Sequence, residues 1–177
     1  MKNILRLSAL ATAIFFASAS SNTASAQATA TASATATIVT PISISKTADM
    51  HFGNIAVSAS NNGSVELAPA GTRLATGGVT LPAVTGSPAA ASFTVSGEAN
   101  YTYAITLPSS PIQLAHTTNA TLTMDAAAFT SSPSSTGTLS GTGTQILNVG
   151  ATLGVAAGQA AGTYTTTTNF DVTVNYN

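Results

Sequence analysis

The chain contains no cysteine and no tryptophan, and Asp, Glu, Lys and Arg together make up only 5% of its residues. Without cysteine it forms no disulfide and no cysteine-ligated zinc site, so packing and backbone hydrogen bonds must stabilise any fold. Average globular proteins are about one-quarter charged. Thr, Ser, Asn and Gly fill the polar positions instead, a composition that suits a protein outside the cell and equally a low-complexity segment that never folds.

The first residues of the chain predict export. Lys2 and Arg6 precede an apolar run from Leu7 to Ala17, and Ala24-Ser25-Ala26 fits the small-x-small pattern of a signal-peptidase site. We therefore expect residues 1–26 to be a signal peptide that is removed. The apolar run is shorter than the ~20 residues that span a bilayer, so we expect an exported mature chain without a transmembrane segment.

The mature chain from Gln27 to Asn177 has the size of one ordinary domain, and cleavage after Ala28 fits the signal pattern nearly as well. Lys46 and Arg73 are its two basic side chains, against five acidic ones, which gives a formal charge of −3. So few basic residues cannot neutralise a row of phosphates. Nucleic acids and anionic membrane surfaces are therefore not expected partners.

Bulky and polar residues alternate through most of the mature chain, which is the pattern of half-buried β-strands. Clusters of Gly, Pro, Asn and Ser separate the alternating stretches and predict turns. The alternating sets are Val65 and Leu67; Phe93 and Val95; Tyr101, Tyr103, Ile105 and Leu107; Leu122 and Met124; Leu147, Val149, Ala151, Leu153 and Val155; and Phe170, Val172, Val174 and Tyr176. We predict an all-β fold, a single immunoglobulin-like antiparallel β-sandwich.

The mature chain begins with a different alternation, in which Ala is followed by Thr or Ser from Ala28 to Ala36. Alternate β-branched threonines weaken a helix and suit an extended strand, so we predict a flexible or extended arm. Pro41 is tolerated only at a strand edge, bend or strand start, and we expect the arm to bend there before it enters the domain. The predicted boundaries are residues 27–45 for the arm and 46–177 for the sandwich.

Residues with catalytic or ligand chemistry are few. Asp49-x-His51 would place two side chains on one face of a strand without a third metal ligand, and His116 stands alone. The stretch from Gly137 to Gly141 misses the spacing of a nucleophile elbow, and that from Gly71 to Gly78 lacks the Lys-Ser/Thr ending of a phosphate-binding loop. We therefore predict no enzyme activity, no cofactor and no bound metal.

Several motifs carry a resemblance to a known family. They are Ala-Thr-Ala-Thr-Ile-Val-Thr-Pro-Ile-Ser-Ile from Ala34 to Ile44; Met50-His51-Phe52-Gly53-Asn54-Ile55; Arg73-x-x-x-Gly77-Gly78-Val79; Ala91-Ser92-Phe93-Thr94-Val95-Ser96-Gly97; and Ala160-Ala161-Gly162-Thr163-Tyr164 leading to Val172-Thr173-Val174-Asn175-Tyr176. With these motifs nearly the whole mature chain resembles the bacterial domain of unknown function 4402 family. More distantly it is similar to the spore-coat-U-like subunits of archaic chaperone-usher pili, although it lacks their cysteine pair.

The pilin resemblance implies a function in assembly. In such subunits the sandwich lacks one strand, and the N-terminal arm of the next subunit replaces a chaperone strand in the open groove. Applied to this chain, the donor face is Ala30, Ala32, Ala34, Ala36 and Ile38, and the acceptor edge is Phe170, Val172, Val174 and Tyr176. The resemblance thus implies a pilin-like structural subunit that polymerises head to tail into a surface fibre.

The same resemblance implies the partners and the location. The partners are other copies of the chain or related subunits, together with a periplasmic chaperone and an outer-membrane usher. The subunit would cross the periplasm and end at the cell surface or outside the cell.

A self-contained secreted sandwich is the alternative hypothesis. The arm would then be a disordered leader, and the protein would act as an adhesin or an extracellular matrix protein. Tyr101 and Tyr103 could contact a glycan or another surface in that case, although their period-two spacing favours packing. The two hypotheses differ in what they expect of the N-terminal arm.

Overall fold

The computed structural model describes residues 27–177, so the predicted signal peptide lies outside the described residues. The chain divides into two units, with the boundary between Thr37 and Ile38. In the first unit, the described arm from Gln27 to Thr37 contains no strand or helix, and each of its residues is exposed. The second unit, from Ile38 to Asn177, is called the body below.

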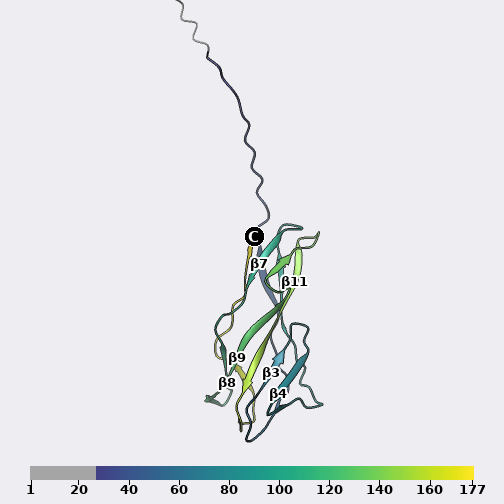
Figure 1. Ribbon diagram of the computed structural model, residues 1–177, viewed down its shortest axis with the longest axis vertical. Coiled ribbons are helices and arrows are strands. Elements are labelled where there is room, and N and C mark those ends of the chain that lie inside the picture. Colours follow the sequence, from purple (N-terminus) through teal and green to yellow (C-terminus); the bar gives the residue numbers. More distant parts are fainter. Residues whose placement is uncertain (1–26) are drawn as a thin grey trace, which may run out of the picture. The chain divides into compact units, whose positions relative to one another are not determined.

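The body is built from strands alone, as Figure 1 shows. They are β1 (Ser43–Ala48), β2 (Ala56–Val57), β3 (Gly63–Leu67), β4 (Arg73–Gly77), β5 (Val79–Thr80), β6 (Ala91–Ser96), β7 (Thr102–Thr106), β8 (Ile112–His116), β9 (Asn119–Ser132), β10 (Thr136–Thr138), β11 (Thr144–Val155), β12 (Tyr164–Thr166) and β13 (Thr173–Tyr176). In residues 27–177 no helix is long and apolar enough to cross a membrane. β1 begins at Ser43, so the last residues of the range expected for the arm belong to a paired strand.

The strands form three antiparallel sheets. The large sheet has the order β1-β6-β11-β9-β8-β12, and β3 and β4 join it through β11. A three-stranded sheet has the order β10-β7-β13, and β2 pairs with β5. The predicted all-β antiparallel sandwich is confirmed.

β11 organises the core because its two halves pair with different strands. Its first half pairs with β6, and its second half, from Ala151 to Val155, pairs with β3. Period two places every second side chain of β11 on one buried face. Along that face, the first half of β11 contributes to one buried cluster and the second half to another. The first-half residues Leu147 and Val149 belong to one cluster, and Leu153 and Val155 belong to the other.

The cluster around the first half of β11 joins the small sheet to the large one. Tyr103 of β7 is completely buried there, and its hydroxyl donates a 2.7 Å hydrogen bond to Gln145 Oε1 of β11. Val174 of β13 and Leu139 pack in the same cluster. Burial raises the pKa of the Tyr103 hydroxyl, because the charged form loses hydration.

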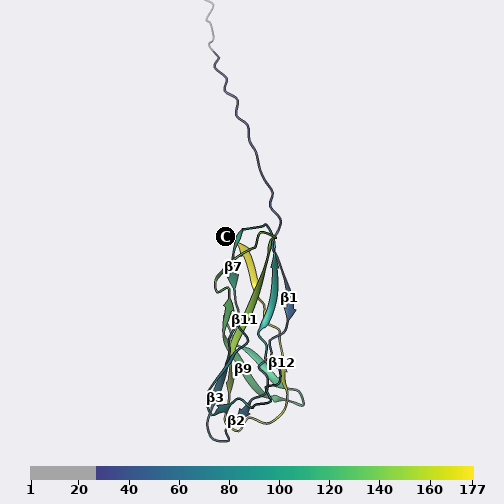
Figure 2. The same ribbon diagram turned by 90° about the vertical axis from the view of Figure 1, so that its right-hand side faces the viewer.

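Among the strands at sheet edges are β1 and β12, both labelled in Figure 2. β1 and β12 end the large sheet, and β13 ends the small one. β12 and β13 belong to one continuous stretch, Tyr164–Tyr176, which we call the C-terminal segment. It pairs first with β8 and then with β7, and Thr167 N between them donates to Gln113 O. Within residues 27–177 no strand pairs with the other side of this segment or with the outer side of β1.

Candidate functional site

A continuous groove runs along the body between these unpaired edges. It consists of two adjoining cavities of about 560 and 440 Å³ that share Met50, Phe52 and Leu114 as lining residues. Phe52 is 9% exposed and Leu114 is 9% exposed, so both belong to the hydrophobic core as well as to the groove. The groove is therefore an opening into the core.

The two margins of the groove come from opposite ends of the body sequence. One margin is β1 with the loop that follows it to Val57, and the other is the chain from Gln159 to Val172, which includes the first part of the C-terminal segment. The floor comes from the strands between them, with Ala91 and Phe93 of β6, Ile112 and Leu114 of β8, Met124 of β9, and Leu153 and Val155 of β11. A strand laid in the groove would contact apolar side chains below, and the unpaired edges of β1 and β12 would lie at its sides.

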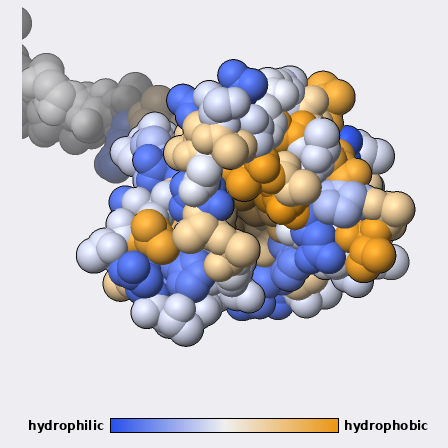
Figure 3. Space-filling model, turned by 90° about the horizontal axis from the view of Figure 1, so that it is seen from below, coloured by the Kyte–Doolittle hydropathy of each residue, from blue (hydrophilic) through white to orange (hydrophobic). Residues whose placement is uncertain are grey.

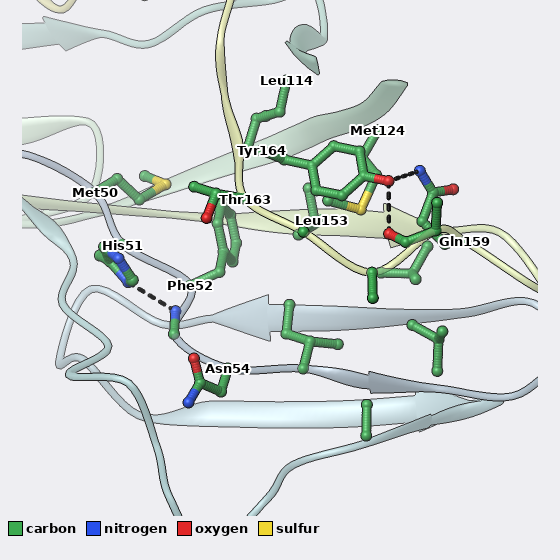
Figure 4. Close-up of a pocket in the computed structure, with 18 residues that line it drawn as sticks. Met50, His51, Phe52, Asn54, Leu114, Met124, Leu153, Gln159, Thr163 and Tyr164 are labelled. Atoms are coloured by element: carbon green, nitrogen blue, oxygen red, sulfur yellow. Dashed lines mark hydrogen bonds between the residues drawn. The ribbon is translucent and has the colours of Figure 1, made fainter. Parts of the chain in front are cut away.

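The larger cavity holds the side chains in Figure 4. Tyr164 lies over Met124 and Leu153, and its hydroxyl donates to Ala160 O at 2.8 Å and accepts from Gln159 Nε2 at 2.9 Å. These hydrogen bonds hold the loop that forms one margin. Seen from below in Figure 3, the surface is hollowed near its centre and hydrophobic residues border the hollow.

The margins run in opposite directions. Thr40, just before β1, is hydrogen-bonded to Tyr176 at the end of β13, whereas Val57 and Gln159 line the far cavity together. The margin from Ile44 to Val57 spans at most about 43 Å at the ~3.3 Å rise of a strand residue. The groove is therefore no longer than a long β-strand.

Three hydrogen bonds close the groove at the Tyr176 end, and we call this group the clamp. Thr40 N donates to Glu98 Oε2 at 2.9 Å, Glu98 N donates to the Tyr176 hydroxyl at 2.6 Å, and that hydroxyl donates to Thr40 O at 2.8 Å. The bond from Thr40 N lowers the pKa of the Glu98 carboxyl, since it favours the charged form. A side chain at Gly97 would overlap the Tyr176 hydroxyl, so a glycine is required next to the clamp.

The motifs that carry the family resemblance support the margin formed by β1 and the chain that follows it to Val57. Arg73 Nη1 donates to Phe52 O at 2.8 Å and to Asn54 O at 2.9 Å. Gly53 between them has a φ of 74°, and a Cβ there would overlap Thr85 O. Arg73 and Gly53 therefore fix the loop that puts Phe52 into the groove floor.

The predicted donor and acceptor residues fall in different environments. The donor residues Ala30, Ala32, Ala34, Ala36 and Ile38 are all exposed, and Ile38 is 95% exposed. Of the acceptor residues, Phe170 and Val172 line the groove without belonging to a strand, whereas Val174 and Tyr176 lie in β13. Val174 is buried in the core, and Tyr176 belongs to the clamp.

The other residues considered for chemistry have structural contacts. Asp49 pairs with Lys46 at 2.6 Å on the exposed rim, and His51 Nδ1 accepts a bond from Gly53 N at 2.9 Å. His116 Nε2 lies 3.1 Å from Ala161 O. Tyr101 is 45% exposed and its ring contacts Tyr176 edge to face at 5.6 Å between centroids.

Sequence reasoning missed β1 as a margin of the groove, and it also missed the clamp. Ile42 and Ile44 alternate directly after Pro41, and this pattern could have predicted an edge strand with one apolar face. Glu98 gave no such signal, because its partners Thr40 and Tyr176 are distant in the sequence. Only the folded chain brings the three together.

The family model described as "Domain of unknown function (DUF4402)" matches residues 42–176, which include every strand of the body. The chain belongs to this family. The searches of curated proteins and of solved structures found no match.

Proposed function

We propose that the protein is a pilin-like structural subunit whose groove accepts a β-strand from another copy, so that copies join head to tail into a fibre outside the cell. One observation carries the proposal: β1 and the C-terminal segment, whose outer sides pair with no strand of residues 27–177, flank an opening into the hydrophobic core. Edges of this kind are normally paired or covered in soluble proteins.

The N-terminal arm supplies a matching strand. From Gln27 to Ile38 it extends for about 36 Å, close to the length of the groove. Its alternate residues from Ala30 to Ala36 are alanines, whose small side chains could enter the groove without displacing the core side chains. No charge would be buried, because the arm contains no Asp, Glu, Lys or Arg.

The free energy of this docking would come mainly from the backbone. Alanine side chains bury little area at about 25 cal/mol per Å², whereas a strand between two edges completes hydrogen bonds on both of its sides. Lys46 and its partner Asp49 lie on the rim near β1, and an edge lysine is a known defence against unwanted strand pairing. These rim charges would favour pairing with a specific, uncharged strand over nonspecific strand pairing.

The linkage is heterologous, because the arm and the groove are different surfaces of one subunit. Such a contact generates an open fibre unless the rotation closes a ring. The resemblance to spore-coat-U-like pilins supports the further proposal that a periplasmic chaperone covers the groove before an outer-membrane usher assembles the subunits.

Peptide binding to an arm-deleted subunit tests the groove. We expect a peptide of residues 27–39 to bind a chain that lacks Thr29–Thr37, and to raise its melting temperature. The matched control replaces Ala30, Ala32, Ala34 and Ala36 with Asn in the peptide, which keeps the backbone and removes the apolar face. Binding is measured by fluorescence anisotropy of the labelled peptide.

A charge in the groove provides the complementary test. Val172→Lys should abolish peptide binding. Thr173→Lys should leave it unchanged, because the side chain of Thr173 is exposed and does not line the groove. Circular dichroism checks that both variants fold. If neither the peptide nor the arm of the full chain engages the groove, and deletion of Thr29–Thr37 leaves the oligomeric state unchanged, a self-contained sandwich with an adhesin or matrix role replaces this proposal.

A further inference from the structure

The arm of each copy is long enough to reach the groove of its own body. Ile38 begins the body, and the groove begins close by, at Ile44 and Val172. If the chain reversed direction near Pro41, the arm would lie antiparallel to β1 and cover the groove that a neighbour is proposed to fill. Head-to-tail assembly therefore requires that the arm is prevented from filling the groove of its own body.

A two-residue turn puts the wrong face of the arm into the groove. With Thr40 and Pro41 as the turn, Val39 would lie opposite Ile42 and Thr37 opposite Ile44. Directly opposite residues of antiparallel strands share one face, and Ile44 faces the groove. The side chains of Thr37, Thr35, Ser33 and Thr31 would then enter the apolar groove, and the alanine face would point to water.

The same turn is also sterically excluded. Two-residue hairpin turns need a positive φ at the first central residue, or at both. Thr40 is β-branched and rarely adopts a positive φ, and the ring of Pro41 fixes its φ near −65°.

A three-residue turn would present the alanine face but requires a left-handed residue at its third position. That residue would be Pro41 or Ile42. The proline ring forbids the left-handed region, and isoleucine is β-branched. A five-residue turn from Ile38 to Ile42 would withdraw Ile42 from its packing against the core and Ile38 from the donor face.

The clamp opposes the remaining reversals. Both backbone groups of Thr40 are occupied, because its N–H bonds Glu98 and its carbonyl bonds Tyr176. A reversal that rotates the peptide groups of Thr40 would have to break these bonds. The residue that must turn is therefore held by two different parts of the body.

We infer that the Val39-Thr40-Pro41-Ile42 stretch bars the arm from the groove of its own body, so that a second copy is the partner of both arm and groove. The inference rests on the proposed function and adds how the chain avoids a closed monomer. A neighbour's arm is free of this restriction, since its register and direction are not set by a turn.

The test installs a permitted turn in the full mature chain. Pro41→Gly places glycine in the left-handed third position of a three-residue turn from Val39, with Ile38 opposite Ile42, and it keeps Thr40, which disfavours the two-residue turn. The matched control, Pro41→Ala, removes proline without supplying a residue that readily adopts the left-handed conformation. Hydrogen exchange of the arm amides and light scattering are measured over a range of protein concentrations.

In the wild-type chain and the control, arm protection and molecular mass should rise together with concentration. In the Pro41→Gly variant the arm should be protected about tenfold or more at every concentration, in a chain that stays monomeric. Concentration-independent protection in the wild-type monomer would overturn the inference, as would a variant that assembles like the wild type. Arms that stay unprotected in all three chains at all concentrations would instead show that the arm pairs with no groove, which would contradict the proposed function as well.

Discussion

Tyr176 shows how one residue can serve several parts of the body. Its ring packs against the core around the first half of β11, while its hydroxyl bonds both Glu98 and Thr40. These contacts join β13 to the chain just before β1 and to the loop after β6. The hydroxyl thus closes the end of the groove where the large and small sheets meet.

Tyr176→Phe should therefore destabilise the body although it keeps the ring. The substitution leaves Glu98 N and Thr40 O without their partner, and we expect a loss of about 1–2 kcal/mol in the free energy of unfolding. Urea denaturation followed by circular dichroism measures this change. Tyr101→Phe is the control, because the structure shows no hydrogen bond of the Tyr101 hydroxyl within residues 27–177.

Equal effects of the two substitutions would show that the clamp contributes nothing to stability. A smaller denaturant midpoint for Tyr176→Phe alone, with the slope unchanged, would support it.

Glu98 makes the clamp sensitive to acid. Its folded-state pKa is lowered by the bond from Thr40 N, so the charged carboxylate stabilises the fold above the ordinary pKa of glutamate. This contribution is lost as the pH falls through the lowered pKa of the folded state. Glu98→Gln should remove that part of the acid destabilisation, and urea midpoints between pH 7 and pH 3 compare it with the wild type.

If the midpoints of the wild type and Glu98→Gln fall in parallel with decreasing pH, the Glu98–Thr40 bond has no part in the acid response.

At the scale of the elements, β11 depends on a glycine where three strands crowd together. Gly150 is buried between the half of β11 that pairs with β6 and the half that pairs with β3. Opposite this point β9 contains a bulge, and Ala128 has a φ of 50°. A Cβ at Gly150 would overlap the carbonyl oxygen of Leu67 and lie 2.9 Å from Pro69 N.

Gly150→Ala should therefore cost about 1–3 kcal/mol, because the Cβ meets backbone atoms that cannot rotate away. Gly154→Ala is a control on the same strand. Its Cβ would have Asp125 O at 3.6 Å as the nearest atom, so we expect no loss beyond a few tenths of a kcal/mol. Thermal unfolding of both variants makes the comparison. Equal melting temperatures would show that the neighbouring backbone shifts to accommodate a Cβ at Gly150.

For the whole molecule, the open groove predicts a gain in stability from a strand supplied at the other end of the chain. Residues 30–44 joined after Asn177 by a flexible Gly/Ser linker, in a chain without its N-terminal arm, should dock beside the C-terminal segment. We expect a rise in melting temperature of about 5 °C or more, equivalent to roughly 2 kcal/mol for a domain of this size.

The control for this graft replaces its alternate alanines with asparagine and keeps the linker. A graft that stabilises the body no more than this control does would remove the case for a missing strand.

Local alternation predicted β3, β6, β7, β9, β11 and β13. Leu147 to Val155 alternates over the whole of β11, and Val65 and Leu67 mark β3, because each strand must bury one face wherever it lies in the fold. The pattern was less informative for Phe170 and Val172, which alternate in the same way but line the groove outside any strand. Alternation shows which side chains seek burial, and it does not show whether a neighbouring backbone is present to pair.

The sequence by itself determined the all-β antiparallel fold and the apolar face of the strands that it predicted. These properties depend on residue spacing and turn chemistry, which act over a few residues. Only the tertiary structure decided that β1 and the C-terminal segment face each other unpaired across an opening into the core, and that Thr40, Glu98 and Tyr176 meet at its end. Such contacts join residues far apart in the chain, so they depend on how the sheets close around the core.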